Sequence, residues 1–218
     1  MDANRILRGN RVLRYTVKER SIHWLAGASY VYLLLNGLAL WSPSMWWMVA
    51  ILGGGPLARA THPWIGLVYF AAVLWMYVEW KQDMRITDLD RKWNQAIGHY
   101  IRNEEEQVPT ADRFNAGQKY LFWLMFWGGV ALLVTGLVLW FSELVPPSLV
   151  FVRQICIFVH PVVFLLTLAG FIIHVYMGTA VERGSFTSVI RGEVTEKWAR
   201  AHHRLWLDRI TGNAPTKK

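Results

Sequence analysis

Long apolar runs alternate with polar, basic segments along the chain, and we predict four membrane-spanning helices from them. Their expected ranges are 21–41, 62–80, 119–141 and 150–181. Each run is close to or above the roughly 20 residues that a helix needs to cross a bilayer. A polar loop at 81–118 separates the second run from the third, and a polar tail at 182–218 follows the fourth. The apolar stretch 45–52 is too short to span and is expected at the membrane surface.

The composition supports a single integral membrane domain over residues 1–218. The chain is 54% hydrophobic and 17% charged, which is too apolar for a soluble enzyme. All of its 23 Lys and Arg residues except Arg59 and Arg153 lie in the N-terminal segment, the middle loop with its flanks, or the tail. Because positive charge is retained on the cytoplasmic side, both termini and the middle loop are expected there. This topology explains the net charge of +8 better than nucleic-acid binding does.

The residues that could bind a metal or cofactor are the histidines. A single cysteine, Cys156, excludes an internal disulfide and any metal site made of cysteines alone. His160 and His174 both lie in the fourth apolar run, 14 residues apart. On one helix this spacing places them roughly 21 Å apart along the axis and within about 40° of the same face. Imidazole is a common axial ligand of haem iron, so one helix can supply a ligand near each side of the membrane.

The predicted topology sorts four histidines into two pairs by depth. His23 and His174 form an inner, cytoplasmic pair, and His62 and His160 form an outer pair. Two six-coordinate haems, one near each face, need such an arrangement. Unrelated packing histidines or a proton relay remain alternatives. The other three histidines lie in cytoplasmic segments and are expected to be surface or contact residues. They are His99, His202 and His203.

Small and polar residues add to this hypothesis. Gly37, 14 residues after His23, would let a porphyrin approach the backbone at the outer level, although ordinary helix packing explains a glycine equally well. Just before the third run, Asn115, Gly117 and Gln118 lie at the cytoplasmic interface. Their amides could bind the carbonyls of a quinone, and the alternative is helix capping and turn formation.

The sequence resembles the cytochrome b (gamma) subunit of membrane-bound respiratory formate dehydrogenase over nearly its whole length. The matching segments are RSIHW, LARATHPWIG, DRFNAGQKYLFW, FVHP, IIHVYM and GSFTSVIRGEVTEKWARAHH. The resemblance implies an all-α four-helix transmembrane bundle with two b haems and both termini in the cytoplasm. It implies His62 and His160 as ligands of the outer haem iron, and His23 and His174 as ligands of the inner one. It also places Asn115, Gly117, Gln118 and His174 at the quinone, which is menaquinone or ubiquinone.

The same resemblance implies partners and a location. The chain would be the quinone-reducing electron-transfer subunit of a formate dehydrogenase complex in the bacterial inner membrane. An iron–sulfur (beta) subunit and a molybdenum- or tungsten-containing (alpha) subunit, which oxidises formate, would dock on its periplasmic face. Apart from these partners it would contact membrane lipid and no nucleic acid. An equivalent two-haem subunit of a hydrogenase or a thiosulfate reductase-type complex remains an alternative. So does a haem-free membrane anchor or transporter whose histidines relay protons.

Overall fold

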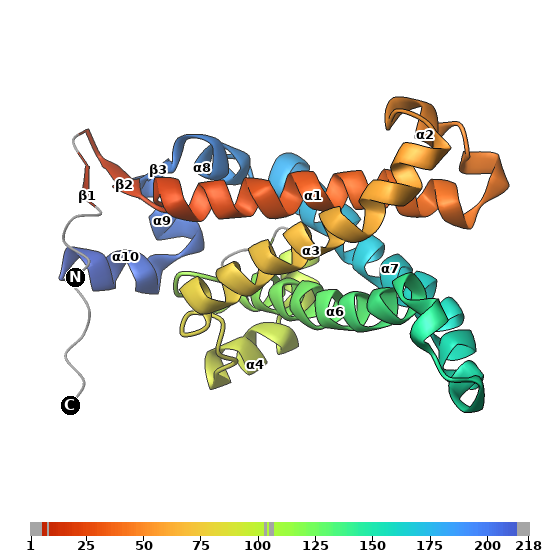
Figure 1. Cartoon of the computed structure of the whole chain (residues 1–218). Coiled ribbons are helices and arrows are strands. Elements are labelled where there is room, and N and C mark those ends of the chain that lie inside the picture. The colour runs from red at the N-terminus through yellow and green to blue at the C-terminus, as the bar shows by residue number, and fades with distance from the viewer. Residues whose placement is uncertain (1–5, 8, 103, 105–106, 213–218) are drawn as a thin grey trace. The chain divides into compact units, whose positions relative to one another are not determined.

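The computed structural model describes residues 6–7, 9–102, 104 and 107–212 and is predominantly helical. Four of its helices are long and apolar enough to cross a membrane, as predicted. They are α1 (Val17–Trp41), α3 (Gly55–Trp80), α6 (Ala116–Trp140) and α7 (Val150–Tyr176) (Figure 1). In the stretch expected at the membrane surface, a 3₁₀ helix (Pro43–Met45) ends at Met45 and a single α-helical turn, α2 (Met48–Ile51), follows. Some basic and acidic residues of the expected loop and termini lie outside the described part, namely Arg5, Arg8, Glu105, Glu106, Lys217 and Lys218.

The chain forms two compact units, which we describe separately. The bundle unit comprises Ser21–Val78 and Trp123–His174. The polar unit comprises Met1–Arg20, Glu79–Phe122 and Val175–Lys218.

Helix α3 begins at Gly55, earlier than the predicted start at residue 62. Pro56 explains the difference, because proline is tolerated in the first turn of a helix, where its missing N–H has no intrahelical partner. The preceding turn is made by Gly53 and Gly54, whose φ angles of +81° and +96° favour glycine. His62 therefore lies about two turns inside a helix rather than at its start.

Aromatic side chains dominate the core of the bundle unit. Tyr30 of α1, Tyr69 of α3 and Phe126 of α6 are buried together, and Phe171 of α7 packs against them. The Tyr30 hydroxyl also donates a hydrogen bond of 3.1 Å to Oγ1 of Thr167 on α7. Thr167 and Phe171 lie between His160 and His174 along α7, so this aromatic layer separates the levels of the two histidines.

Glycines allow α6 and α7 to approach closely. A Cβ at Gly128 would lie 2.5 Å from Cγ2 of Thr167, and one at Gly136 would lie 3.3 Å from Cε1 of His160. Both positions lie on α6 and face α7. Larger residues there would push the helices apart, so these glycines fix where α7 holds its histidines.

The polar unit contains a short antiparallel sheet that the sequence analysis did not predict. Its strand order is β1 (Ile6–Leu7), β2 (Arg11–Leu13), β3 (Glu193–Thr195), with Val12 opposite Val194. Three short helices of the tail accompany the sheet (Figure 1), namely α8 (Ser185–Arg191), α9 (Glu196–His202) and α10 (Arg204–Thr211). Strands β2 and β3 share an apolar core with α9 and α10, which consists of Val12, Val194, Ala199, Trp206, Leu207 and Ile210.

The middle loop also has helical structure. It forms α4 (Asp88–Gln95) and α5 (Ile97–Ile101). Helix α4 starts with a capping box in which Asp90 accepts hydrogen bonds from the backbone N–H and hydroxyl of Thr87, both at 2.7 Å.

His203, expected to be a surface or contact residue, is a buried contact residue. Its side chain is 0% exposed. Nε2 accepts a hydrogen bond of 3.0 Å from Arg14, and Nδ1 donates one of 2.7 Å to the carbonyl of Asp112. Burial, reinforced by the charge of Arg14, holds the pKa of His203 well below its ordinary value. The neutral imidazole therefore links the N-terminal strands, the loop and the tail.

We expect His203 to make the protein sensitive to acid. Below about pH 6.5 the unfolded chain binds a proton on this histidine that the folded chain excludes. The free energy of unfolding should then fall with decreasing pH, by at most about 1.4 kcal/mol per pH unit from this group. Thermal unfolding at pH 7.5 and 5.5 measures the effect. The decrease in Tm should be smaller in His203→Gln, and an equal decrease in both proteins would contradict the prediction.

Candidate functional site

Each predicted histidine pair lies together in the bundle unit. The ring centres of His23 on α1 and His174 on α7 are 6.0 Å apart. Those of His62 on α3 and His160 on α7 are 6.3 Å apart. Helix α7 thus supplies one member of each pair, as the 14-residue spacing required.

This spacing fits a shared metal between the two rings of each pair. A bond from imidazole nitrogen to a transition metal is about 2.0–2.1 Å long, so two imidazoles on opposite sides of one metal have ring centres roughly 6 Å apart. Direct hydrogen bonding between two ring nitrogens would bring the rings closer than that. The spacing of both pairs is therefore compatible with two imidazoles that bind one metal.

Within the part of the chain that the structure describes, two of these histidines lack the hydrogen bonds that buried packing residues normally make. Nδ1 of His23 and Nδ1 of His62 are buried and have no hydrogen-bond partner among the described residues. Buried polar atoms are normally paired, and such histidines would be unfavourable in a packed core without a further role. His160 differs, because its Nδ1 lies 2.8 Å from Oγ1 of Thr135.

Open space borders one histidine of each pair. Gly27 follows His23 by four residues, and Gly66 follows His62 by four. A Cβ at either glycine would meet no atom within 4 Å. A planar macrocycle beside each imidazole needs such a surface without side chains. Gly27 was not predicted from the sequence, although the spacing His-x-x-x-Gly, which occurs at both His23 and His62, could have indicated it.

Gly37, by contrast, faces protein atoms in the structure. A Cβ there would meet the ring of Phe164 at 3.8 Å, an ordinary contact distance. Packing against Phe164 therefore does not by itself require glycine at this position. Its role in haem packing stays a prediction.

The expected quinone residues begin α6 in the polar unit, and they cap this helix. Oδ1 of Asn115 accepts a hydrogen bond of 2.9 Å from the N–H of Gln118, and Oε1 of Gln118 accepts one of 3.1 Å from the N–H of Asn115. Helix capping and quinone binding are therefore compatible in this segment. The amide oxygens cap the helix, while the two NH₂ groups donate to no described residue. Asn115 is buried, Gln118 is half-buried and Gly117 is exposed. His174 belongs to the bundle unit.

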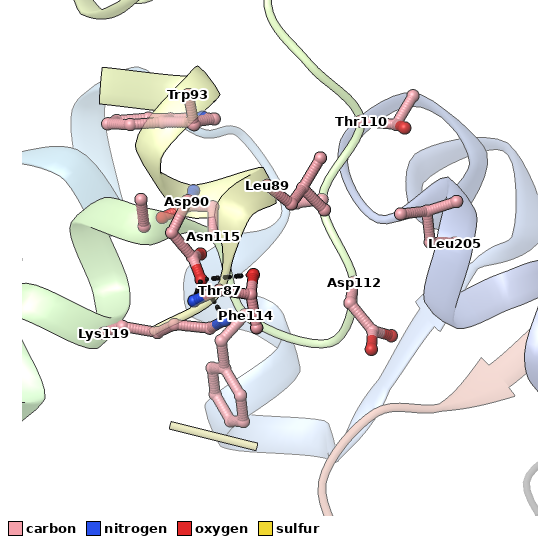
Figure 2. A pocket seen from close by; sticks show the side chains of 12 residues that line it. Thr87, Leu89, Asp90, Trp93, Thr110, Asp112, Phe114, Asn115, Lys119 and Leu205 are labelled. Atoms are coloured by element: carbon pink, nitrogen blue, oxygen red, sulfur yellow. Dashed lines mark hydrogen bonds and ion pairs between the residues drawn. The ribbon is translucent and has the colours of Figure 1, made fainter. Parts of the chain in front are cut away.

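A cavity of about 140 Å³ adjoins this segment within the polar unit (Figure 2). Asn115, Lys119 and Asp90 line it together with Thr87, Thr110 and Asp112. Six polar and six apolar residues line the cavity, and a cavity of this volume has room for several water molecules. Water can therefore reach the side of Asn115.

Buried ion pairs hold the segment in place on both sides. After it, Lys119 donates to Asp90 at 2.8 Å and to the carbonyl of Arg85 at 3.0 Å. Burial would raise the pKa of Asp90, but its hydrogen bonds from Lys119 and Thr87 lower it below its ordinary value. The carboxylate thus stays ionised and serves as an anchor.

Before the segment, Arg113 donates to Asp83 at 2.8 Å and also to Glu19. Burial would lower the pKa of Arg113, but these two carboxylates raise it. The Trp80 indole donates to Glu19 as well, at 2.8 Å. The network fixes the backbone that leads into Asn115.

Comparison with known proteins identifies the family. A family model described as prokaryotic cytochrome b561 matches residues 14–192. The formate dehydrogenase cytochrome b556(fdo) subunit of Escherichia coli K12 is 31% identical, covering 93% of this chain and 95% of the relative. The formate dehydrogenase cytochrome b556 subunit of Haemophilus influenzae is 29% identical over 90% of this chain and 82% of its own. The nitrate-inducible cytochrome b556(Fdn) subunit of E. coli K12 is 27% identical over 91% of both chains. The chain therefore belongs to the prokaryotic cytochrome b561 family of haem b membrane proteins, and its relatives are cytochrome b subunits of formate dehydrogenases.

Proposed function

We propose that this chain holds two b haems and passes electrons from a formate dehydrogenase to a membrane quinone. The observation that carries the proposal is the distance between the two ring centres in each histidine pair, 6.0 Å and 6.3 Å. Helix α7 supplies one histidine of each pair. His62 and His160 would hold the outer haem iron, and His23 and His174 the inner one. Bound haem b would supply a one-electron iron couple at each level.

The protein's contribution is to separate the two levels and to exclude water from them. The aromatic layer around Tyr30, Tyr69 and Phe171 lies between the histidine pairs along the helices. Apolar surroundings and fixed axial ligands keep a haem site six-coordinate and limit its contact with water. Electrons would enter at the outer pair and leave at the inner pair.

The proposed acceptor is menaquinone or ubiquinone near the cytoplasmic start of α6. A quinone carbonyl only accepts hydrogen bonds, and the uncommitted NH₂ groups of Asn115 and Gln118 are neutral donors. Reduction to the quinol takes two electrons and two protons. The cavity beside Asn115 supports a supply of protons by water from the cytoplasmic side. The resemblance to formate dehydrogenase gamma subunits also implies Gly117 and His174 as residues at the quinone.

The relatives' names support the choice of donor. All three relatives described above are subunits of formate dehydrogenases, which favours a formate dehydrogenase over a hydrogenase or thiosulfate reductase-type complex. The proposed partners are an iron–sulfur subunit and a molybdenum- or tungsten-containing catalytic subunit. They would bind the periplasmic face of the bacterial inner membrane, with both termini of this chain in the cytoplasm.

Stopped-flow spectroscopy of the purified chain tests the proposal. The protein is reduced with a limiting amount of dithionite and mixed with short-chain analogues of menaquinone or ubiquinone. We expect the reduced b-type absorbance to disappear as quinol forms, one quinol for every two electrons lost. Haem that stays reduced with both analogues would refute the quinone-reducing role and leave haem binding intact.

A further inference from the structure

We propose that Thr135 is a positioning residue for His160 and that it tunes the outer haem without affecting the inner one. The proposal rests on the proposed function in one respect, the assignment of His160 as an axial ligand. Thr135 lies on α6, whereas His160 lies on α7. Sequence reasoning gave no sign of this contact, because a threonine in an apolar helix is unremarkable by itself.

The hydrogen bonds around Thr135 determine which nitrogen of His160 carries the proton. The Thr135 hydroxyl donates to the carbonyl of Ala131, one turn earlier in its own helix, at 2.7 Å. Its oxygen is therefore left to accept, and Nδ1 of His160 lies 2.8 Å from it. Nδ1 then holds the proton, and Nε2 presents its lone pair for a metal. Thr135 is only 8% exposed, so water does not compete for this bond.

The neighbouring residue leaves the space that the ring needs. A Cβ at Gly136 would lie 3.3 Å from Cε1 of His160, which is tighter than an ordinary contact. Two consecutive residues of α6 thus act on one imidazole. Thr135 bonds the ring, and Gly136 allows it to approach the helix.

The bond to Thr135 distinguishes His160 from His62, its partner in the outer pair, and from His23. Within the described residues, Nδ1 of His23 and Nδ1 of His62 have no such partner. A hydrogen bond from the second ring nitrogen makes an imidazole ligand more basic. A more basic ligand stabilises ferric iron over ferrous iron. The bond to Thr135 should therefore lower the reduction potential of the outer haem.

Thr135→Val tests the proposal, because valine keeps the shape of threonine but cannot accept a hydrogen bond. We expect the reduction potential of the outer haem to rise, that of the inner haem to stay unchanged, and the outer site to bind haem roughly 10- to 100-fold more weakly. Thr135→Ser, which keeps the hydroxyl, should behave like the parent protein. Redox titration and EPR of the ferric haems provide the readouts.

Thr167→Val is the matched control. Thr167 is fully buried on α7, and its hydroxyl bonds Tyr30 and the carbonyl of Phe164 rather than a histidine. An outer-haem potential and affinity that are the same in Thr135→Val as in Thr167→Val would overturn the proposal. If the valine variant does not fold, the comparison of Thr135→Ala with Thr135→Ser decides in the same way. If His160→Ala loses the outer haem but Thr135→Val leaves the outer-haem potential unchanged, the positioning role of Thr135 is refuted and the assignment of His160 as a ligand stands. Retention of both haems in His160→Ala refutes the ligand assignment.

Discussion

Replacing His160 with alanine should remove the outer haem and leave the inner haem in place. His160 pairs with His62 at 6.3 Å, whereas the inner pair of His23 and His174 uses other residues. One remaining imidazole cannot hold a six-coordinate haem. The haem content of the purified protein, measured as pyridine haemochrome, should fall from two per chain to one.

The control for this prediction is His99→Ala. His99 lies in the polar unit and pairs with Glu104. Its replacement should leave both haems bound. Survival of both haems in His160→Ala would show that this histidine is not a ligand. Loss of both haems from a folded variant would show that the two sites are not independent.

Asn115→Asp should slow quinone reduction roughly 100-fold while leaving the haem content normal. Aspartate is as good an N-cap as asparagine, so the start of α6 is retained. The substitution removes the NH₂ donor and places a carboxylate, which only accepts hydrogen bonds, beside the quinone oxygen. Loss of one donor to a developing negative charge typically costs a factor of 10²–10³ in rate. Gln118→Glu removes the second donor and keeps the capping box.

Asn94→Asp makes the same chemical change at an exposed position in the same unit, where Asn94 donates to the Tyr120 hydroxyl. It should reduce quinone at the parent rate. Stopped-flow reoxidation of the reduced haems by quinone measures all three variants. An unchanged rate in Asn115→Asp would remove this residue from the quinone site. Loss of haem in that variant would make the segment structural.

The features that sequence predicted best are those that depend on long-range regularity. The four spans follow from hydropathy, since a membrane allows only long apolar helices to cross it. The pairing of His23 with His174 and of His62 with His160 follows from topology, because depth in a membrane is fixed by position along each span.

The features that sequence missed depend on contacts between distant segments. The strands Arg11–Leu13 and Glu193–Thr195 are only three residues long, and they pair the two ends of the chain. Such short strands carry no readable alternation. His203 is in the polar tail, yet its contacts with Arg14 and Asp112 bury it completely. Composition gives the average environment of a segment and not that of one side chain.

Residues that position a proposed haem-binding histidine, without contacting the haem themselves, were the hardest to predict. Thr135 and Gly136 serve His160 across a helix interface, and nothing in their local sequence distinguishes them from packing residues. The residues near Asn115 were easier to single out because polar amides stand directly before the third apolar run. Helix capping, the alternative that the sequence also offered for these residues, is shown by their hydrogen bonds.

The most direct test of the central claim is a reduced-minus-oxidised spectrum, combined with a haem count, on the protein purified in detergent. Two b haems per chain with low-spin, bis-histidine spectra are the expected result. Folded protein without haem would contradict the account, and the histidine pairs would then have to serve a proton relay or a membrane anchor.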